Sequence, residues 1–175
     1  MKKLPIICLI DTSIYNSFEK LHATNIALEL FHNLVSRDDY LKENCEIFFY
    51  TFSTDLIFQG KLNLKSKLNI FQVEENKISG LNFIGNALYK LKSLNKFKGN
   101  FYKPNLFIFS AHAPADTLVF DYYCKEKNEF SSICIFSFVG NVLGSKYEYM
   151  KLTDNVLNVE YLNEALLSMC LKFEE

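Results

Sequence analysis

Three short segments carry the polar side chains that could do chemistry in this chain. They are residues 11–15 (DTSIY), residues 79–88 (SGLNFIGNAL) and residues 110–116 (SAHAPAD). Carboxylate, hydroxyl and amide oxygens of the kind found in them are ligands of hard cations such as Mg²⁺. No Gly-x-Gly-x-x-Gly or Gly-x-x-x-x-Gly-Lys loop follows the first strand, and no Gly-x-Ser-x-Gly turn is present. The segments therefore indicate a site for a cation or a partner rather than a nucleotide or an acyl substrate.

A buried strand precedes two of these segments. Residues 4–10 and residues 105–110 are short apolar runs, the pattern of strands that are covered on both faces of a parallel sheet. The carboxyl ends of parallel strands meet at one edge of the sheet, and ligands bind there in folds of this kind. We therefore expect Asp11, which follows the strand at residues 4–10, to lie close to the loop that follows the strand at residues 105–110.

The remaining elements alternate between strand and helix. We expect an antiparallel hairpin or edge ribbon in residues 56–64, with Gln59-Gly60 as its turn. The order predicts an α/β fold of three layers: a mostly parallel central sheet of about six strands, an antiparallel edge strand, and helices on both faces. Further strands are expected at residues 46–52, 133–139 and 156–159, and helices at residues 17–35, 82–94, after Pro114, 146–150 and 161–171. The apolar face of the first helix is expected to contain Phe18, Leu21, Ile26, Leu30, Phe31, Leu34 and Val35.

The composition is that of one ordered globular domain. The chain has 175 residues, of which 49% are hydrophobic and 22% charged, and we expect a single domain over residues 1–175. No membrane span or secretory signal is evident, and the five cysteines lack the paired spacing of zinc sites, so we expect a cytoplasmic protein with reduced cysteines. A net charge of -1 argues against binding to nucleic acid. The lysines of residues 90–103 are expected to form a solvated face.

The chain resembles the von Willebrand factor A domain over nearly its whole length. Four stretches carry the resemblance: LPIICLIDTS, SGLNFIGNAL, YKPNLFIFSAHAPAD and DNVLNVEYLNEALLSM. They are most similar to the bacterial tellurium-resistance proteins of the TerY-like group. In this family a divalent cation is held by an Asp-x-Ser-x-Ser loop, a threonine at the start of a later helix and an aspartate after the fourth strand.

At that site the chain departs from the family pattern. Asp11 and Ser13 match the first two ligands, whereas Tyr15 replaces the second serine, Asn82 the threonine and Ala111 the aspartate. Losing a carboxylate and a short hydroxyl removes charge and oxygen atoms that a hard cation needs. We therefore expect no bound cofactor; if Mg²⁺ does bind, its ligands are Asp11, Ser13 and Asn82.

Simpler roles are open to the acidic residues and the histidine of these loops. Asp11 could accept hydrogen bonds from the backbone of its own turn or cap the next helix. Asp116 could stabilise the start of the helix after Pro114 through the helix dipole. His112 stands next to the lost aspartate position, where it could form part of the rim of a binding face.

The resemblance implies a protein-binding module without catalytic residues. Its binding residues would be Asp11, Ser13, Tyr15, Asn82, Ala111 and His112, on the loops of the decayed metal site. The same resemblance implies a role in the response to tellurite or other stress, with a kinase, a phosphatase or another tellurium-resistance protein as partner. Two alternatives remain open: a metal-binding receptor domain with fewer ligands, and a PIN-like metal-dependent nuclease using Asp11, Asp116 and Asp121.

Overall fold

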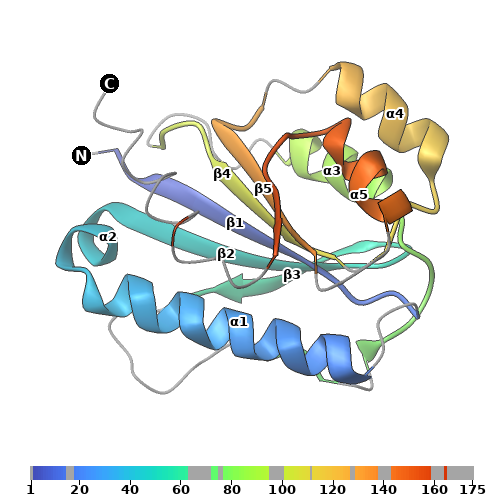
Figure 1. Cartoon of the computed structure of the whole chain (residues 1–175). Coiled ribbons are helices and arrows are strands. Elements are labelled where there is room, and N and C mark those ends of the chain that lie inside the picture. Colours follow the sequence, from blue (N-terminus) through green and yellow to red (C-terminus); the bar gives the residue numbers. More distant parts are fainter. Residues whose placement is uncertain are drawn as a thin grey trace.

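The chain forms a six-stranded sheet with helices on both faces (Figure 1). The computed structural model describes residues 2–14, 18–62, 72–74, 77–94, 101–110, 112–126, 129–137, 143–158 and 164. The strand order is β3-β2-β1-β4-β5-β6, and only β3 runs antiparallel to its neighbour. The strands are β1 (Leu4–Asp11), β2 (Cys45–Phe52), β3 (Leu56–Lys61), β4 (Asn105–Phe109), β5 (Ser132–Ser137) and β6 (Val156–Asn158). The predicted fold class is confirmed.

Helices cover the two faces unequally. α1 lies along one face of the sheet, and α3, α4 and α5 lie on the other (Figure 1). Short α2 connects the end of α1 to β2. The described helices are α1 (Phe18–Arg37), α2 (Asp39–Asn44), α3 (Ile84–Ser93), α4 (Thr117–Lys125) and α5 (Leu143–Met150).

The position of β1 inside the sheet explains why its sequence is apolar up to Asp11. Ile6, Cys8 and Ile10 pack into the hydrophobic core under α1, and Ile7 and Leu9 pack into the core under α3 and α4. Successive side chains of a strand point to opposite faces, so a strand covered on both faces needs apolar residues at every position. Asp11 is the first polar residue of β1, and it lies where the strand ends.

The antiparallel edge differs from the predicted hairpin. β3 is one continuous strand, and the chain turns at residues 53–55 rather than at Gln59-Gly60. Gly60 lies opposite Phe49 and Phe58 lies opposite Tyr50, so Gln59 is an extra residue in a β-bulge. Gly60 adopts a φ of 143°, which a residue with a side chain rarely does. The Gln-Gly signal was therefore a bulge and not a turn.

The predicted apolar face of α1 is wrong at two positions. Ile26 and Leu30 are 47% and 50% exposed. They lie on the far side of the helix from Leu21, Phe31 and Val35, which are buried against the sheet. Apolar residues occur around much of this helix, and their spacing alone did not distinguish the two sides. The buried face also includes Thr24, Ala27, Leu28 and His32.

The other predicted elements agree with the structure to within a few residues where it describes them. α2 was not predicted; Asp38 begins it by accepting a hydrogen bond from the Leu41 backbone N–H at 2.9 Å. The expected closing helix, residues 161–171, lies outside the described residues except for Glu164, which is helical.

Among the described residues no helix is both long and apolar enough to span a membrane. Among the described residues, Cys8, Cys45, Cys124 and Cys134 form no disulfide bond with one another, and Cys170 lies outside the described residues.

Candidate functional site

The site lies at the carboxyl edge of the sheet, where β1 and β4 end side by side. Ile10 lies opposite Phe109 in the parallel register, so the next residues along the two strands, Asp11 and Ser110, are neighbours. Asn82 lies just before α3, and its side chain reaches both of them. The predicted convergence of the three loops at this edge is therefore observed for these residues.

Asp11 is fully buried, and protein donors surround its carboxylate. Its Oδ1 accepts the backbone N–H of Ser13 at 2.8 Å, which closes a turn immediately after the strand. Its Oδ2 accepts the Asn82 Nδ2 amide at 2.9 Å and the Ser110 hydroxyl at 2.7 Å. The expected role of Asp11 in binding the backbone of its own turn is thus observed, and two side-chain donors add to it.

Burial dominates the electrostatics of this carboxylate. The loss of hydration raises the pKa of Asp11 above its ordinary value, while the hydrogen bonds from Ser13 and Ser110 lower it. Each donor therefore offsets part of the cost of burying a negative charge. The site depends on these donors for its stability at neutral pH.

Tyr149 of α5 completes the network, and the sequence did not predict its role. Its hydroxyl donates toward the Ser110 Oγ at 2.7 Å and the His112 carbonyl at 2.6 Å. The Asn82 amide also lies 3.1 Å from the same carbonyl. Burial raises the pKa of Tyr149, so the hydroxyl keeps its proton and remains a donor. No sequence signal distinguishes Tyr149 from Tyr147, which is exposed on the same helix.

Backbone hydrogen bonds fix the loops around this network. The Ile14 N–H donates to the Gly80 carbonyl at 3.0 Å, and the Ser79 N–H donates to the Thr12 carbonyl at 2.9 Å. Gly80 has a φ of 72°, and a Cβ at this position would lie 2.3 Å from the Thr54 hydroxyl oxygen. Glycine is required there because the conformation and the space both exclude a side chain.

Asp116 stabilises a different helix from the one expected. Its two carboxylate oxygens accept the backbone N–H groups of Gly85 and Asn86 at 3.2 and 2.7 Å, at the start of α3. Although Asp116 precedes α4, its side chain makes no capping hydrogen bond to that helix. α3 and α4 pack closely, because a Cβ on Gly85 would lie 2.5 Å from the Phe120 backbone nitrogen. The helix-dipole role is therefore real but belongs to α3.

The structure assembles four of the six predicted binding residues. Asp11, Ser13 and Asn82 are in the buried network, and His112 contributes its carbonyl to it and lies half-buried at the rim. Tyr15 and Ala111 lie outside the described residues.

The acidic residues of the nuclease alternative do not form one cluster. Asp116 is bound to the backbone of α3, and Asp121 pairs with Lys151, which directly follows α5, at 2.9 Å. Over the part of the chain that the structure describes, no group of three or more His, Cys, Asp or Glu side chains is placed to hold a metal ion.

The arrangement around Asp11 does not suit a divalent cation either. Asn82 directs its amide nitrogen toward Asp11, and its Oδ1 has no hydrogen-bond partner. A cation would need an oxygen on that side, so the amide would have to rotate and give up its hydrogen bonds to the Asp11 carboxylate and the His112 carbonyl. The Ser13 Oγ is also buried without a partner. The donor set present therefore provides a neutral N–H₂ group where an ion would have to bind.

The comparison with known proteins rests on structure alone. No protein-family model matches the sequence, and no curated protein matches it. The PilB minor pilin from Streptococcus sanguinis superposes with a TM-score of 0.67 at 10% identity, over 99% of this chain and 62% of the pilin. The ArnB paralog VWA2 from Sulfolobus acidocaldarius gives 0.61 at 16% identity, over 95% of this chain and 45% of that protein. This chain thus spans less than two thirds of either protein.

A third structure matches over its full length. BatB from Bacteroides thetaiotaomicron superposes with a TM-score of 0.59 at 12% identity, over 97% of this chain and 98% of BatB. Identities this low show a shared fold and not a shared activity. Together with the strand order and the antiparallel edge, these matches show that the chain has the von Willebrand factor A fold.

Proposed function

We propose that this chain is a non-catalytic module that binds another protein through the carboxyl edge of its sheet, without a metal ion. One observation carries the proposal: the Asp11 carboxylate is buried and is already bonded to protein donors from Ser13, Asn82 and Ser110. A carboxylate bound in this way stabilises the loops and has little acceptor capacity left for an ion or a substrate. The loops themselves then become the binding surface.

The residues above the network support this proposal. We name Ile14, Gly80, Leu81 and His112 the loop face. Ile14 and Leu81 are 59% and 37% exposed, and the hydrogen bond from Ile14 to Gly80 holds their two loops together. Exposed apolar side chains on a rigid base lose little conformational entropy on binding, and such residues form the centres of protein interfaces.

The sequence resemblance supports a more specific role. It is the basis for proposing a TerY-like scaffold in the cytoplasm that acts in tellurite or other stress responses. A kinase, a phosphatase or another tellurium-resistance protein is the partner that the resemblance favours. Neighbouring genes that encode such proteins would strengthen this part of the proposal.

A selection of displayed random peptides against the immobilised protein in EDTA tests the binding role. We expect enriched peptides whose affinity falls at least about tenfold when Ile14→Lys places a charge on the loop face, which corresponds to about 1.4 kcal/mol. Tyr40→Lys is the matched control, because Tyr40 is similarly exposed, at 56%, but lies on α2 at the opposite edge of the sheet (Figure 1).

Two results would contradict the proposal. One is a set of peptides that bind both lysine variants as well as they bind the wild type, which would place binding elsewhere. The other is binding that disappears in EDTA and returns with Mg²⁺, which would favour the metal-binding alternative.

A further inference from the structure

One lysine in the described part of the chain differs from the others in its surroundings. Four described lysines are half-buried: Lys3, Lys20, Lys42 and Lys90. Lys3, Lys42 and Lys90 each form an ion pair with a carboxylate, of Glu46, Asp39 and Asp55 respectively. Lys20 forms no ion pair with a described residue.

Lys20 contacts a neutral group instead. Its Nζ lies 2.5 Å from Nε2 of His112. An ammonium group can only donate, so this imidazole nitrogen must be the unprotonated acceptor. The contact therefore satisfies one of the three N–H groups of the ammonium, and no carboxylate of the described residues forms an ion pair with it.

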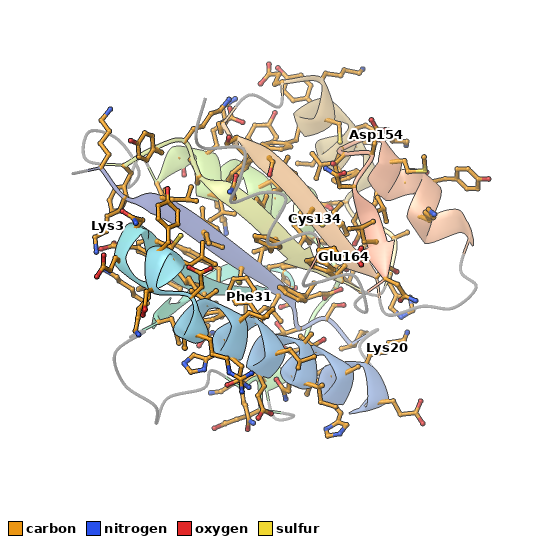
Figure 2. The ribbon with its side chains drawn as sticks, turned by 60° about the vertical axis from the view of Figure 1, so that its left-hand side comes forward. Lys3, Lys20, Phe31, Cys134, Asp154 and Glu164 are labelled. Carbon is orange, nitrogen blue, oxygen red and sulfur yellow. The ribbon has the colours of Figure 1, made fainter. Side chains whose placement is uncertain are left out.

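The position of Lys20 on α1 adds to the positive potential. Lys20 is the third residue of a helix of 20 residues, near the end where the helix dipole is positive. A cation there is unfavourable, and an anion would be favoured. Figure 2 shows Lys20 at the start of α1, and the helix begins at the same edge at which β1 and β4 end.

His112 belongs to the loop face and contacts the Lys20 ammonium. Its side chain contacts Lys20, and its carbonyl accepts hydrogen bonds from Asn82 and Tyr149 in the buried network. The imidazole is thus held in place from its backbone. An ammonium on a positioned imidazole is a preorganised donor site at the rim of an apolar face.

We propose that the Lys20 ammonium and the His112 imidazole form a docking point for a carboxylate side chain, Asp or Glu, of the protein partner. This inference rests on the proposed function and specifies the chemistry of the partner: an acidic residue flanked by apolar residues that contact Ile14 and Leu81. Charge-assisted hydrogen bonds are about twice as strong as neutral ones. Replacing the acid by its amide is therefore expected to weaken binding about tenfold or more.

The test is a peptide selection on three forms of the full chain: wild type, Lys20→Met and Lys20→Glu. Peptides selected on wild type are expected to share an Asp or Glu at one position next to apolar residues. Lys20→Met is expected to lose this preference, and Lys20→Glu is expected to select Lys or Arg at that position. Thermal unfolding of the two variants, with midpoints close to wild type, shows that the fold is kept.

A double-mutant cycle then measures the contact itself. For one wild-type peptide, replacing its acid by the amide is expected to weaken binding about tenfold or more to wild type and less than about twofold to Lys20→Met. Equal losses for both proteins would overturn the inference.

The selection separates failure of the inference from failure of the proposed function. Peptides that depend on Ile14 but share no acidic position overturn the docking point and leave the binding module in place. If no peptide depends on the loop face, the proposed function fails as well.

Discussion

Replacing Asn82 by alanine removes one of the two side-chain donors that bind Asp11 from outside its own turn. The Asn82 amide contacts the Asp11 carboxylate at 2.9 Å, the Ser110 hydroxyl at 3.0 Å and the His112 carbonyl at 3.1 Å, and the side chain is fully buried. The variant leaves the Asp11 carboxylate buried with one fewer side-chain donor. A water molecule that replaced the amide would have to enter a buried site.

The expected cost follows from these contacts. A hydrogen bond to a charged group contributes about 1.5–3 kcal/mol, and the space left by the amide adds to the loss, so we expect Asn82→Ala to destabilise the protein by about 2–4 kcal/mol. For a protein of this size, that lowers the unfolding midpoint by roughly 5–12 °C. Asn86→Ala is the matched control: within the described part of the chain its amide donates to the exposed Thr54 carbonyl at 3.2 Å, and we expect a loss below about 1 kcal/mol.

The nearly isosteric change Asn82→Asp separates the charge from the packing. It places a second carboxylate beside Asp11, and two buried carboxylates at hydrogen-bond distance cannot both ionise at low cost. We expect urea unfolding to show a loss larger than that of alanine at pH 7 and a partial recovery as the pH falls and one carboxyl takes up a proton. The reasoning is refuted if Asn82→Ala costs no more than Asn86→Ala, or if Asn82→Asp is no worse than alanine at neutral pH.

Three further predictions concern the same edge of the sheet. Tyr149→Phe is expected to lower the free energy of unfolding, measured by chemical denaturation, by about 1–3 kcal/mol, because the Ser110 and His112 acceptors lose a donor. Tyr147 is exposed, so Tyr147→Phe is expected to be neutral. Equal effects of the two changes would contradict the role of the Tyr149 hydroxyl. Gly85→Ala is expected to lower the unfolding midpoint, because its Cβ would lie 2.5 Å from the Phe120 nitrogen. A midpoint at or above wild type, as helix propensity alone would give, would show that α4 can move. Burial raises the pKa of Asp11 in the folded state, so protonation of Asp11 stabilises the fold. This stabilisation is fully present below the unfolded pKa near 3.8 and is lost as pH rises through the folded pKa. Relative to Asp11→Asn, wild type should therefore lose stability as pH rises over this window, and a pH-independent difference would contradict the shift.

The order of the elements and the convergence of the loops could be predicted from the sequence. Apolar strands that alternate with helices define a parallel sheet, and parallel strands must end at one edge. Asp11 and the segment after β4 were therefore neighbours by topology alone. The pairing with Ser110 in particular depends on the register of β1 and β4, which the sequence pattern does not specify.

Contacts between side chains from different elements could not be predicted. Tyr149, Asp116 and Lys20 reach the site or its surroundings from three different elements, and their roles depend on how those elements pack on the sheet. The exposed Ile26 and the bulge at Gly60 have the same cause, because local periodicity and turn propensity were interpreted without the tertiary contacts that override them.

Thermal unfolding in EDTA and in saturating Mg²⁺, Mn²⁺ or Ca²⁺ tests most directly whether the site works without a metal. We predict the same midpoint in all four conditions for wild type and no metal effect in Asp11→Ala. The triple variant Tyr15→Ser, Asn82→Thr, Ala111→Asp restores the residues of the family pattern and serves as the positive control. An ion at one hundred times its dissociation constant stabilises by about 2.7 kcal/mol, or roughly 5–10 °C here. A rise of that size in wild type, abolished by Asp11→Ala, would contradict the metal-free account.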